Sequence, residues 1–339
     1  MTTSAPGAAR DAAYDVTGIG NAIVDVIAHA DDAFLAANTI EKGAMTLIDA
    51  TRAEELYGRM GPGVEVSGGS AGNTMAGIAM LGGRGAYVGK VAKDQLGDVF
   101  RHDIRAAGVA FDSAPLVGGA PTARCLILVT PDAQRSMNTY LGACVELGPE
   151  DIDETLIAAS QVTYLEGYLW DPPRAKEAFR KAAEIAHAAG RKVSLSLSDS
   201  FCVHRHHAEF VDLVERHVDI LFANEHEIGA LYGTDRFEDA LAAVKRLGKT
   251  AALTRSEKGA VIVSAGEVVE VAAEPVERVV DTTGAGDLYA AGFLFGHTRG
   301  LSPAVCGRLG AVAAAEIISH VGARPEVNLR ELVAAKGIL

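Results

Sequence analysis

Apolar strand patterns alternate with helical patterns along most of the second half of the chain. The expected strands are 162–165, 192–197, 220–223 and 251–254, and the helices between them are 173–189, 208–217, 225–231 and 237–247. A strand, a covering helix and another strand in succession give parallel pairing, with helices packed on both faces of the sheet. The sequence therefore predicts an α/β fold around a mostly parallel sheet.

Two parts of the chain break this alternation. Residues 123–129 and 135–140 are short strand patterns separated by a Thr-Pro-Asp-Ala turn, which predicts a hairpin. The segment 27–50 follows neither pattern. We expect these parts to form a small accessory sheet.

Composition excludes several classes of protein. The 339 residues carry a net charge of −13, whereas binders of nucleic acid or anionic membranes need a basic face. No stretch reaches the roughly 18 apolar residues that a membrane helix needs, and residues 1–13 read as a loose tail without the apolar core of a signal peptide. The four cysteines are scattered, which indicates buried reduced thiols. We expect a cytoplasmic protein that binds neither nucleic acid nor membranes.

The strongest local signal is the segment Asp281-Thr282-Thr283-Gly284-Ala285-Gly286-Asp287, which follows a β-branched pair and opens a helix of small residues. Glycines allow close approach of a ligand to the backbone, and free amides at a helix start bind anions. A carboxylate beside bound phosphate can accept a hydroxyl proton, as phosphoryl transfer requires. The alternative is that Asp287 only caps its helix.

Three weaker signals accompany this motif. The Gly-Gly-Ser-Ala-Gly-Asn loop at 68–73 opens another helix and suits a polyhydroxylated ligand, or is a flexible loop. Asn21 and Asp25 could together bind a ribose diol, although for this pair alone a turn cap is the simpler interpretation. Asn224 and Glu227 follow a parallel strand, where ligands collect, and could hold hydrated Mg²⁺ or start a solvated helix.

The motif at 281–287, the loop at 68–73 and the element with Asn224 and Glu227 together resemble the PfkB/ribokinase family of carbohydrate and nucleoside kinases. The resemblance extends over about residues 14–325. Residues 18–25, 134–141 and 219–225 are most similar to its adenosine kinases. The resemblance implies a three-layer α/β/α ribokinase-like fold with a central, mostly parallel sheet and a small β lid. The large domain would comprise 14–26, 51–117 and 143–330, and the lid 27–50 and 118–142, with 1–13 as a disordered tail.

The resemblance also implies roles for individual residues. Asp287 matches the catalytic base, and the amides of Gly284, Ala285 and Gly286 match the anion hole. The remaining matches are Asn21, Asp25, Gly69 and Asn73 for the ribose; Leu141, Tyr168 and Phe201 near the acceptor base; Thr254, Arg255, Gly259, Thr283 and Gly286 for ATP; and Asn224 and Glu227 for Mg²⁺. Arg135, in the lid, would either neutralise the transferring phosphate or be a surface arginine.

The expected reaction is ATP-dependent phosphorylation of the 5′-hydroxyl of a nucleoside, adenosine giving AMP, with Mg²⁺ and with activation by K⁺ left open. The alternatives are a sugar kinase for ribose or fructose, an inosine or guanosine kinase, and a catalytically silent binding protein on the same fold. A NAD-dependent oxidoreductase is a remote alternative, because Gly18-Ile19-Gly20 is followed by Ile23 where the dinucleotide fingerprint needs glycine or alanine. We expect a monomer or homodimer.

Overall fold

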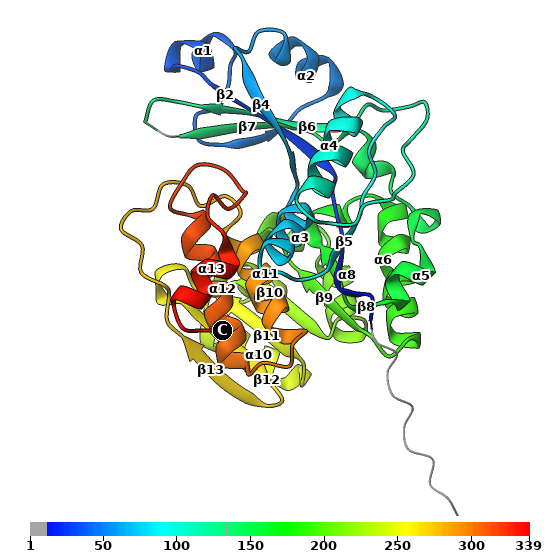
Figure 1. The fold of residues 1–339 in the computed structure, drawn as a ribbon, viewed down its shortest axis with the longest axis vertical. Helices are drawn as coiled ribbons and strands as arrows, with labels where there is room; N and C mark the ends of the chain where they lie inside the picture. Colours follow the sequence, from blue (N-terminus) through cyan, green and yellow to red (C-terminus); the bar gives the residue numbers. More distant parts are fainter. Residues whose placement is uncertain (1–11, 133) are drawn as a thin grey trace, which may run out of the picture.

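Two β-sheets organise the chain in the computed structural model, which describes residues 12–132 and 134–339 (Figure 1). The larger sheet has the strand order β13 (Glu267–Val271), β12 (Ala260–Ser264), β11 (Thr250–Thr254), β10 (Ile220–Asn224), β9 (Lys192–Ser196), β8 (Ser160–Glu166), β1 (Tyr14–Ile19) and β5 (Gly85–Val88). All pairs from β5 to β11 are parallel, and only β12 and β13 are antiparallel. The predicted mostly parallel sheet is confirmed.

Helices cover both faces of this sheet. On one face lie α3 (Ser70–Met80), α11 (Ala285–His297) and α12 (Pro303–Ile317), and on the other α6 (Pro173–Ala188), α8 (His207–Arg216), α9 (Glu225–Tyr232) and α10 (Phe237–Leu247). Successive residues of β10 alternate between the two cores: Phe222 packs with the first set of helices and Leu221 with the second. Strands buried on both faces need uninterrupted apolar sequence, which explains the patterns that predicted them. The architecture is the three-layer α/β/α fold.

The smaller sheet lies beyond the carboxyl ends of the parallel strands, at the top of Figure 1. Its order is β3 (Met45–Leu47), β7 (Arg135–Tyr140), β6 (Ala123–Val129), β2 (Ile23–His29) and β4 (Gly63–Gly68). Strands β6 and β7 form the predicted antiparallel hairpin. Two short helices, α1 (Asp32–Ala37) and α2 (Ala50–Tyr57), pack on it through the buried Leu35 and Leu56. We call this sheet and its two helices the lid.

The expected membership of three segments needs correction. Residues 23–26, 51–57 and 63–68 were assigned to the large domain, yet they belong to β2, α2 and β4 of the lid. After β1 the chain leaves the large sheet at 20–22 and enters the lid sheet as β2. The return crossing uses Gly69, whose φ is +84° and where a Cβ would lie 2.1 Å from the carbonyl oxygen of Asn21. Residues 1–11 of the expected tail lie outside the described part.

The remaining elements connect these layers. They are α4 (Gln95–Ala106), α5 (Glu154–Ala158), α7 (Ser200–Arg205), α13 (Leu329–Ala335), and four 3₁₀ helices, η1 (Gly142–Glu146), η2 (Pro149–Asp151), η3 (Gly167–Trp170) and η4 (Ser256–Lys258). All four cysteines are free and buried, as predicted. Within the described residues, no helix has both the length and the hydrophobicity to cross a bilayer.

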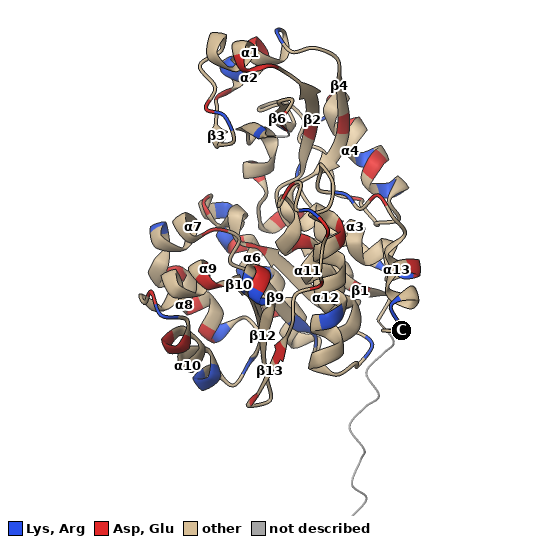
Figure 2. Cartoon of the chain, turned by 90° about the vertical axis from the view of Figure 1, so that its left-hand side faces the viewer, with Lys and Arg blue, Asp and Glu red and all other residues tan. Residues whose placement is uncertain are grey.

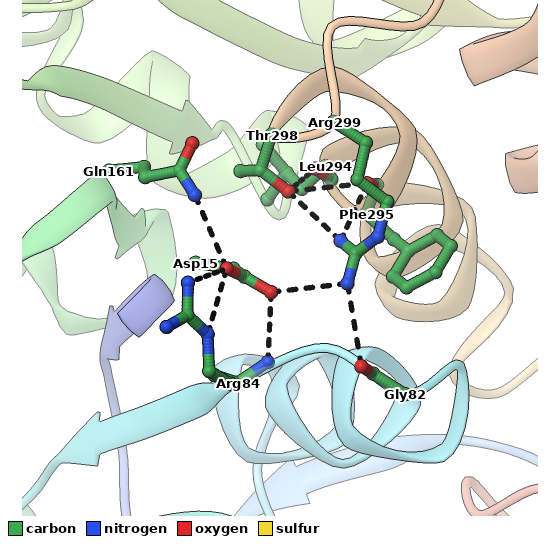
Figure 3. A network of polar contacts seen from close by, with 8 residues as sticks. All are labelled: Asp15, Gly82, Arg84, Gln161, Leu294, Phe295, Thr298 and Arg299. Atoms are coloured by element: carbon green, nitrogen blue, oxygen red, sulfur yellow. Dashed lines mark hydrogen bonds and ion pairs between the residues drawn. The ribbon is translucent and has the colours of Figure 1, made fainter. Parts of the chain in front are cut away.

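A polar network fixes the amino-terminal edge of the large sheet (Figure 3). Asp15 accepts hydrogen bonds from the backbone and guanidinium of Arg84, from Arg299 just after α11 and from Gln161 on β8. Burial would raise the pKa of Asp15, but the hydrogen bonds from Arg84 and the charges of Arg299 and Arg84 outweigh it and lower the pKa. The network therefore joins β1, β8, the start of β5 and the end of α11.

Charged residues are dispersed over the outer helices. Figure 2 shows Lys and Arg beside Asp and Glu on helices of both the lid and the large domain, without a uniformly basic element among those described. The described helices that this view shows therefore carry charges of both signs.

Candidate active site

The first turns of α3 and α11 meet at Asp287. Its two carboxylate oxygens accept hydrogen bonds from Ser70 Oγ at 2.6 Å and Asn73 Nδ2 at 3.0 Å. The two helices can approach because their contact uses small residues: a Cβ on Gly77 would lie 2.8 Å from Cβ of Ala291. The motif at 281–287 and the loop at 68–73, far apart in sequence, thus form one site.

The environment of Asp287 favours proton acceptance. Burial raises the pKa of its carboxyl group, against hydrogen bonds from Ser70 and Asn73 and the charge of Arg324, which lower it. The side-chain oxygen of Asn73 is buried without a hydrogen-bond partner among the described residues. A free acceptor therefore lies beside the carboxylate, where a substrate hydroxyl could donate.

Asp25 faces the same site from the lid strand β2. Burial raises its pKa to about 6, against the charges of Arg135 and Arg324, and the charge of Asp287 raises it further. Gly68 is required beside it, because a Cβ there would lie 2.5 Å from the Asp25 carboxyl carbon. Asp25 is therefore a desolvated carboxyl group near Asp287 and the 68–73 loop.

Asn21 does not pair with Asp25 in the expected way. Its side-chain amide donates to Glu166 Oε1 at 2.7 Å, and its backbone amide donates to the same oxygen at 3.3 Å. The other oxygen, Glu166 Oε2, accepts from the amide of Ala71 at 2.8 Å. The Asn21 amide nitrogen is thus used within the protein, although Asn21 borders the same site as Asp25.

Arg135 is not a surface residue of the lid. Its guanidinium forms an ion pair with Asp281, and their side chains are only 5% and 8% exposed. Asp281 also accepts from the amides of Thr283 and Gly322, both at 3.0 Å. Two further nitrogens of Arg135, Nε and Nη2, are buried without a partner among the described residues. The pair ties the lid to the loop before α11 and leaves donors for an anion.

The predicted anion hole lies at the start of α11. Gly284 adopts a left-handed φ of +80° and precedes the first turn, whose amides lack intrahelical acceptors. The amide of Ala285 donates to the Thr282 carbonyl at 3.2 Å, so this amide is already bonded within the turn. The amides of Gly284 and Gly286 and the positive helix end are the better candidates for phosphate.

Asn224 and Glu227 form a capping box at the start of α9. Asn224 Oδ1 accepts from the Glu227 amide at 2.9 Å, and Glu227 accepts from the backbone and side-chain nitrogens of Asn224. Burial raises the pKa of Glu227 to about 7, and the charge of Asp199 also raises it. No group of three or more His, Cys, Asp or Glu suited to a metal occurs in the described part. The donor chemistry fits a Mg²⁺ ion held through water, not one enclosed by protein.

Three of the five expected ATP residues, Thr254, Arg255 and Gly259, lie at the end of β11 and in the turn to β12. Arg255 pairs with Glu225 at 3.4 Å and stacks on Phe237 at 4.0 Å. Gly259 has a φ of +84°, and a Cβ there would lie 2.1 Å from the Val271 carbonyl oxygen. Thr254 is half-buried at the end of β11. The contacts of Arg255 and Gly259 are structural, and an ATP role for this turn stays a prediction.

The residues expected near the acceptor base are separated. Leu141 lines an apolar cavity of about 350 Å³ together with Leu47, Ile48 and Tyr140 of the lid. Tyr168, on η3, and Phe201, on α7, are 43% and 78% exposed and do not line that cavity. Burial and then the charges of Asp199, Asp287, Glu227 and Glu166 raise the pKa of Tyr168, so its hydroxyl lies where these acids converge. Of the three expected residues, only Leu141 lines the cavity.

Three residues of the site had no predicted role. Ser70 lies inside the recognised loop, and Glu166 ends an apolar strand, the same signal that drew attention to Asn224. Arg324 donates to the Ser67 and Gly72 carbonyl oxygens at 2.6 and 3.0 Å and acts by charge on Asp25 and Asp287. No local pattern distinguishes Arg324 in the sequence, because the fold brings it to the site.

Known proteins resemble this chain over nearly its whole length. The model of the pfkB family carbohydrate kinases matches residues 40–329. The adenosine kinase of Saccharomyces cerevisiae is 28% identical over 331 residues, which cover 90% of this chain and 94% of the yeast protein.

Two solved structures share the fold and more than half of the residues. The adenosine kinase of Sinorhizobium meliloti is 61% identical, with a TM-score of 0.87 over 96% of this chain and 99% of that one. A probable sugar kinase from Rhizobium etli is 56% identical, with a TM-score of 0.90 over 97% and 100% of the two chains. These matches exclude the remote oxidoreductase alternative. The chain belongs to the pfkB family of carbohydrate kinases and is an ATP-dependent kinase of the adenosine kinase-like type.

Proposed function

We propose that the chain transfers the γ-phosphoryl group of ATP to the 5′-hydroxyl of adenosine, giving AMP. The observation that carries the proposal is Asp287, held at the start of α11 by Ser70 and Asn73. A half-buried carboxylate beside helix amides is the arrangement that phosphoryl transfer to an alcohol needs.

Asp287 would accept the hydroxyl proton as the oxygen attacks. Its raised pKa makes the carboxylate a stronger base than an exposed aspartate. The Gly284 and Gly286 amides would stabilise the negative charge on the moving phosphoryl group, and the buried donors of Arg135 add positive charge from the lid. Asp25 and the free oxygen of Asn73 would bind the ribose hydroxyls, and closure of the lid would exclude water.

Mg²⁺ would be held through water by Asn224 and Glu227, and when bound it supplies charge neutralisation for the phosphates. The chain's own contribution there is the capping box, which fixes both side chains against the start of α9. Activation by K⁺, the oligomeric state and a cytoplasmic location stay predictions.

The apolar cavity beneath the lid favours a nucleoside over a free sugar. Leu47, Ile48 and Leu141 offer a surface on which a purine can pack, whereas ribose or fructose would leave it empty. The sugar kinase named among the similar structures keeps the alternative specific: phosphorylation of a free furanose at the same carboxylate.

A substrate panel tests the proposal. Adenosine, inosine, guanosine, cytidine, ribose and fructose would each be supplied with Mg·ATP while ADP release is measured. We expect the highest kcat/KM with adenosine. A preference for ribose or fructose would overturn the nucleoside assignment and leave the kinase class unchanged.

A further inference from the structure

Glu166 is a buried carboxyl group at the centre of the site that the proposed reaction does not use. It is the last residue of β8 and is 1% exposed. Oε1 accepts from both nitrogens of Asn21, and Oε2 accepts from the amide of Ala71. Both oxygens are thus bonded to the protein, so Glu166 acts through other residues.

The residues that Glu166 holds come from two elements on opposite sides of the site. Asn21 lies on the crossing from β1 to β2, and Ala71 lies between Ser70 and Asn73, the two donors to Asp287. Space for this contact depends on Gly20, where a Cβ would lie 2.2 Å from Glu166 Oε2. One carboxylate therefore sets the distance between the lid crossing and the first turn of α3.

We propose that Glu166 is a positioning residue for phosphoryl transfer. By holding Asn21 and the first turn of α3, it aligns Ser70 and Asn73, which donate to Asp287, with the acceptor nucleoside bound from the lid side. This inference rests on the proposed role of Asp287 as the base. Small misplacements at a reacting centre lower turnover strongly, so the effect belongs to kcat more than to binding.

Only an ionised carboxylate satisfies this arrangement. All three partners are N–H donors, and a protonated acid or an amide would set a donor against one of them. Burial raises the pKa of Glu166 to about 7, against hydrogen bonds from Ala71 and Asn21, and the charge of Asp287 raises it further. The other titratable groups facing it are Tyr87, Cys144, Tyr164 and Tyr168. The alignment is therefore expected to weaken on the acid side of neutrality.

The test compares Glu166→Gln with Glu166→Asp, which keeps the charge on a shorter arm. With saturating adenosine and Mg·ATP, we expect E166Q to lower kcat about 10- to 100-fold with a smaller change in KM. Ionisation of Glu166, whose pKa burial raises to about 7, should contribute to the acid limb of the kcat–pH profile beside that of Asp287. The limb should therefore move to lower pH in E166Q, which keeps only the other groups, and persist in E166D. Asp15→Asn is the matched control, since it alters another buried carboxylate of the same sheet, at its far edge.

The outcomes separate the two proposals. An E166Q protein with unchanged kcat, or with lowered kcat and an unmoved acid limb, overturns the positioning role. If E166Q does not fold, E166D decides alone: normal kcat overturns the role, whereas reduced kcat with the limb retained supports it. If the unaltered protein does not phosphorylate adenosine, or if Asp287→Asn turns over normally, the proposed function fails instead.

Discussion

Helix α11 runs between two aspartates, one half-buried and one buried, whose carboxylates are held in opposite ways. Asp287, in its first turn, has neutral donors, a hydroxyl and an amide, and burial raises its pKa. Asp15 lies beyond its last turn, and two guanidinium groups overcome burial and lower the pKa (Figure 3). Arg324 is near Asp287, but its hydrogen bonds go to the carbonyl oxygens of Ser67 and Gly72 and to Ser67 Oγ. The protein thus stabilises the ionised form of Asp15 beyond the last turn of α11, which we call the structural end. It leaves Asp287 more basic in the first turn, which we call the reactive end.

The largest expected effect is that of Asp287→Asn. Loss of the base should lower kcat by about 10²–10⁴-fold. The folded protein should be as stable as before or more so at pH 7.5, because a pKa raised by folding means that ionisation destabilises the fold. That gain should shrink as the pH falls below the folded pKa and vanish below the unfolded pKa, where both states are protonated. Steady-state kinetics and thermal melts at pH 7.5 and 4 measure both effects.

Asparagine is a close replacement here, because it can still accept from Asn73 and donate to Ser70 Oγ. A D287N protein that turns over at near-normal rate would remove the base role. A large loss of stability at neutral pH would show that Asp287 resembles Asp15 more than we infer.

Arg135→Met tests the ion pair between Arg135 and Asp281, which lies at the reactive end of α11. Both partners are almost fully buried, so removal of the guanidinium leaves the Asp281 carboxylate with neutral donors alone, the amides of Thr283 and Gly322 and the Thr283 side chain. Breaking a buried pair costs about 3–5 kcal/mol of unfolding free energy. Denaturant unfolding of R135M, of Asp281→Asn and of the double variant measures the coupling. Additive losses would mean that the pair does not hold the lid to the loop.

Asp15→Asn should have a smaller effect on stability and leave kcat unchanged. The side chain of Arg84 is 57% exposed, so its partner is less costly to lose than at Asp281, and we expect about 2 kcal/mol. Because folding lowers the pKa of Asp15, its stabilisation is present above the unfolded pKa and is lost as the pH falls through the folded pKa. The deficit of D15N should therefore vanish in acid. A fall in kcat at 25 °C would contradict the separation of the two ends.

The sequence predicts the large domain better than the lid. Alternating strands and helices of the parallel sheet carry continuous apolar runs, so their order and type could be derived from local patterns. The change of sheet at 20–22 could not, because Val16 and Val24 are both buried β-branched residues and only tertiary contacts place them in different sheets.

The same limit applies to the site. Asp287 and Asn73 lie in glycine-rich loops with a local signal, and the structure brings them together. Arg324 and the pairing of Arg135 with Asp281 depend on contacts between residues more than 100 positions apart, which no local pattern records. Asn21 shows a further limit: the residue was recognised, but its partner Glu166 was not.

The smallest expected effect concerns Asp25, whose pKa is influenced both by burial, as for Asp287, and by two arginines, as for Asp15. Two arginines act on it by charge, yet burial still raises its pKa to about 6. If the ionised form binds the ribose, adenosine affinity should weaken about tenfold from pH 7.5 to pH 5, because one unit below the pKa about one molecule in eleven keeps the charge. Calorimetric titration at both pH values measures this change.

Asp25→Asn is the control, since asparagine resembles the protonated acid. Its affinity should be low and the same at both pH values, whereas E166Q should keep the pH dependence of binding because both oxygens of Glu166 are bonded to the protein. Folding raises the pKa of Asp25, so D25N should also be the more stable protein at pH 7.5, by a margin that disappears near pH 4. A pH-independent affinity in the unaltered protein would mean that Asp25 stays ionised at pH 5. The arginines, rather than burial, would then dominate this carboxylate, as they do Asp15.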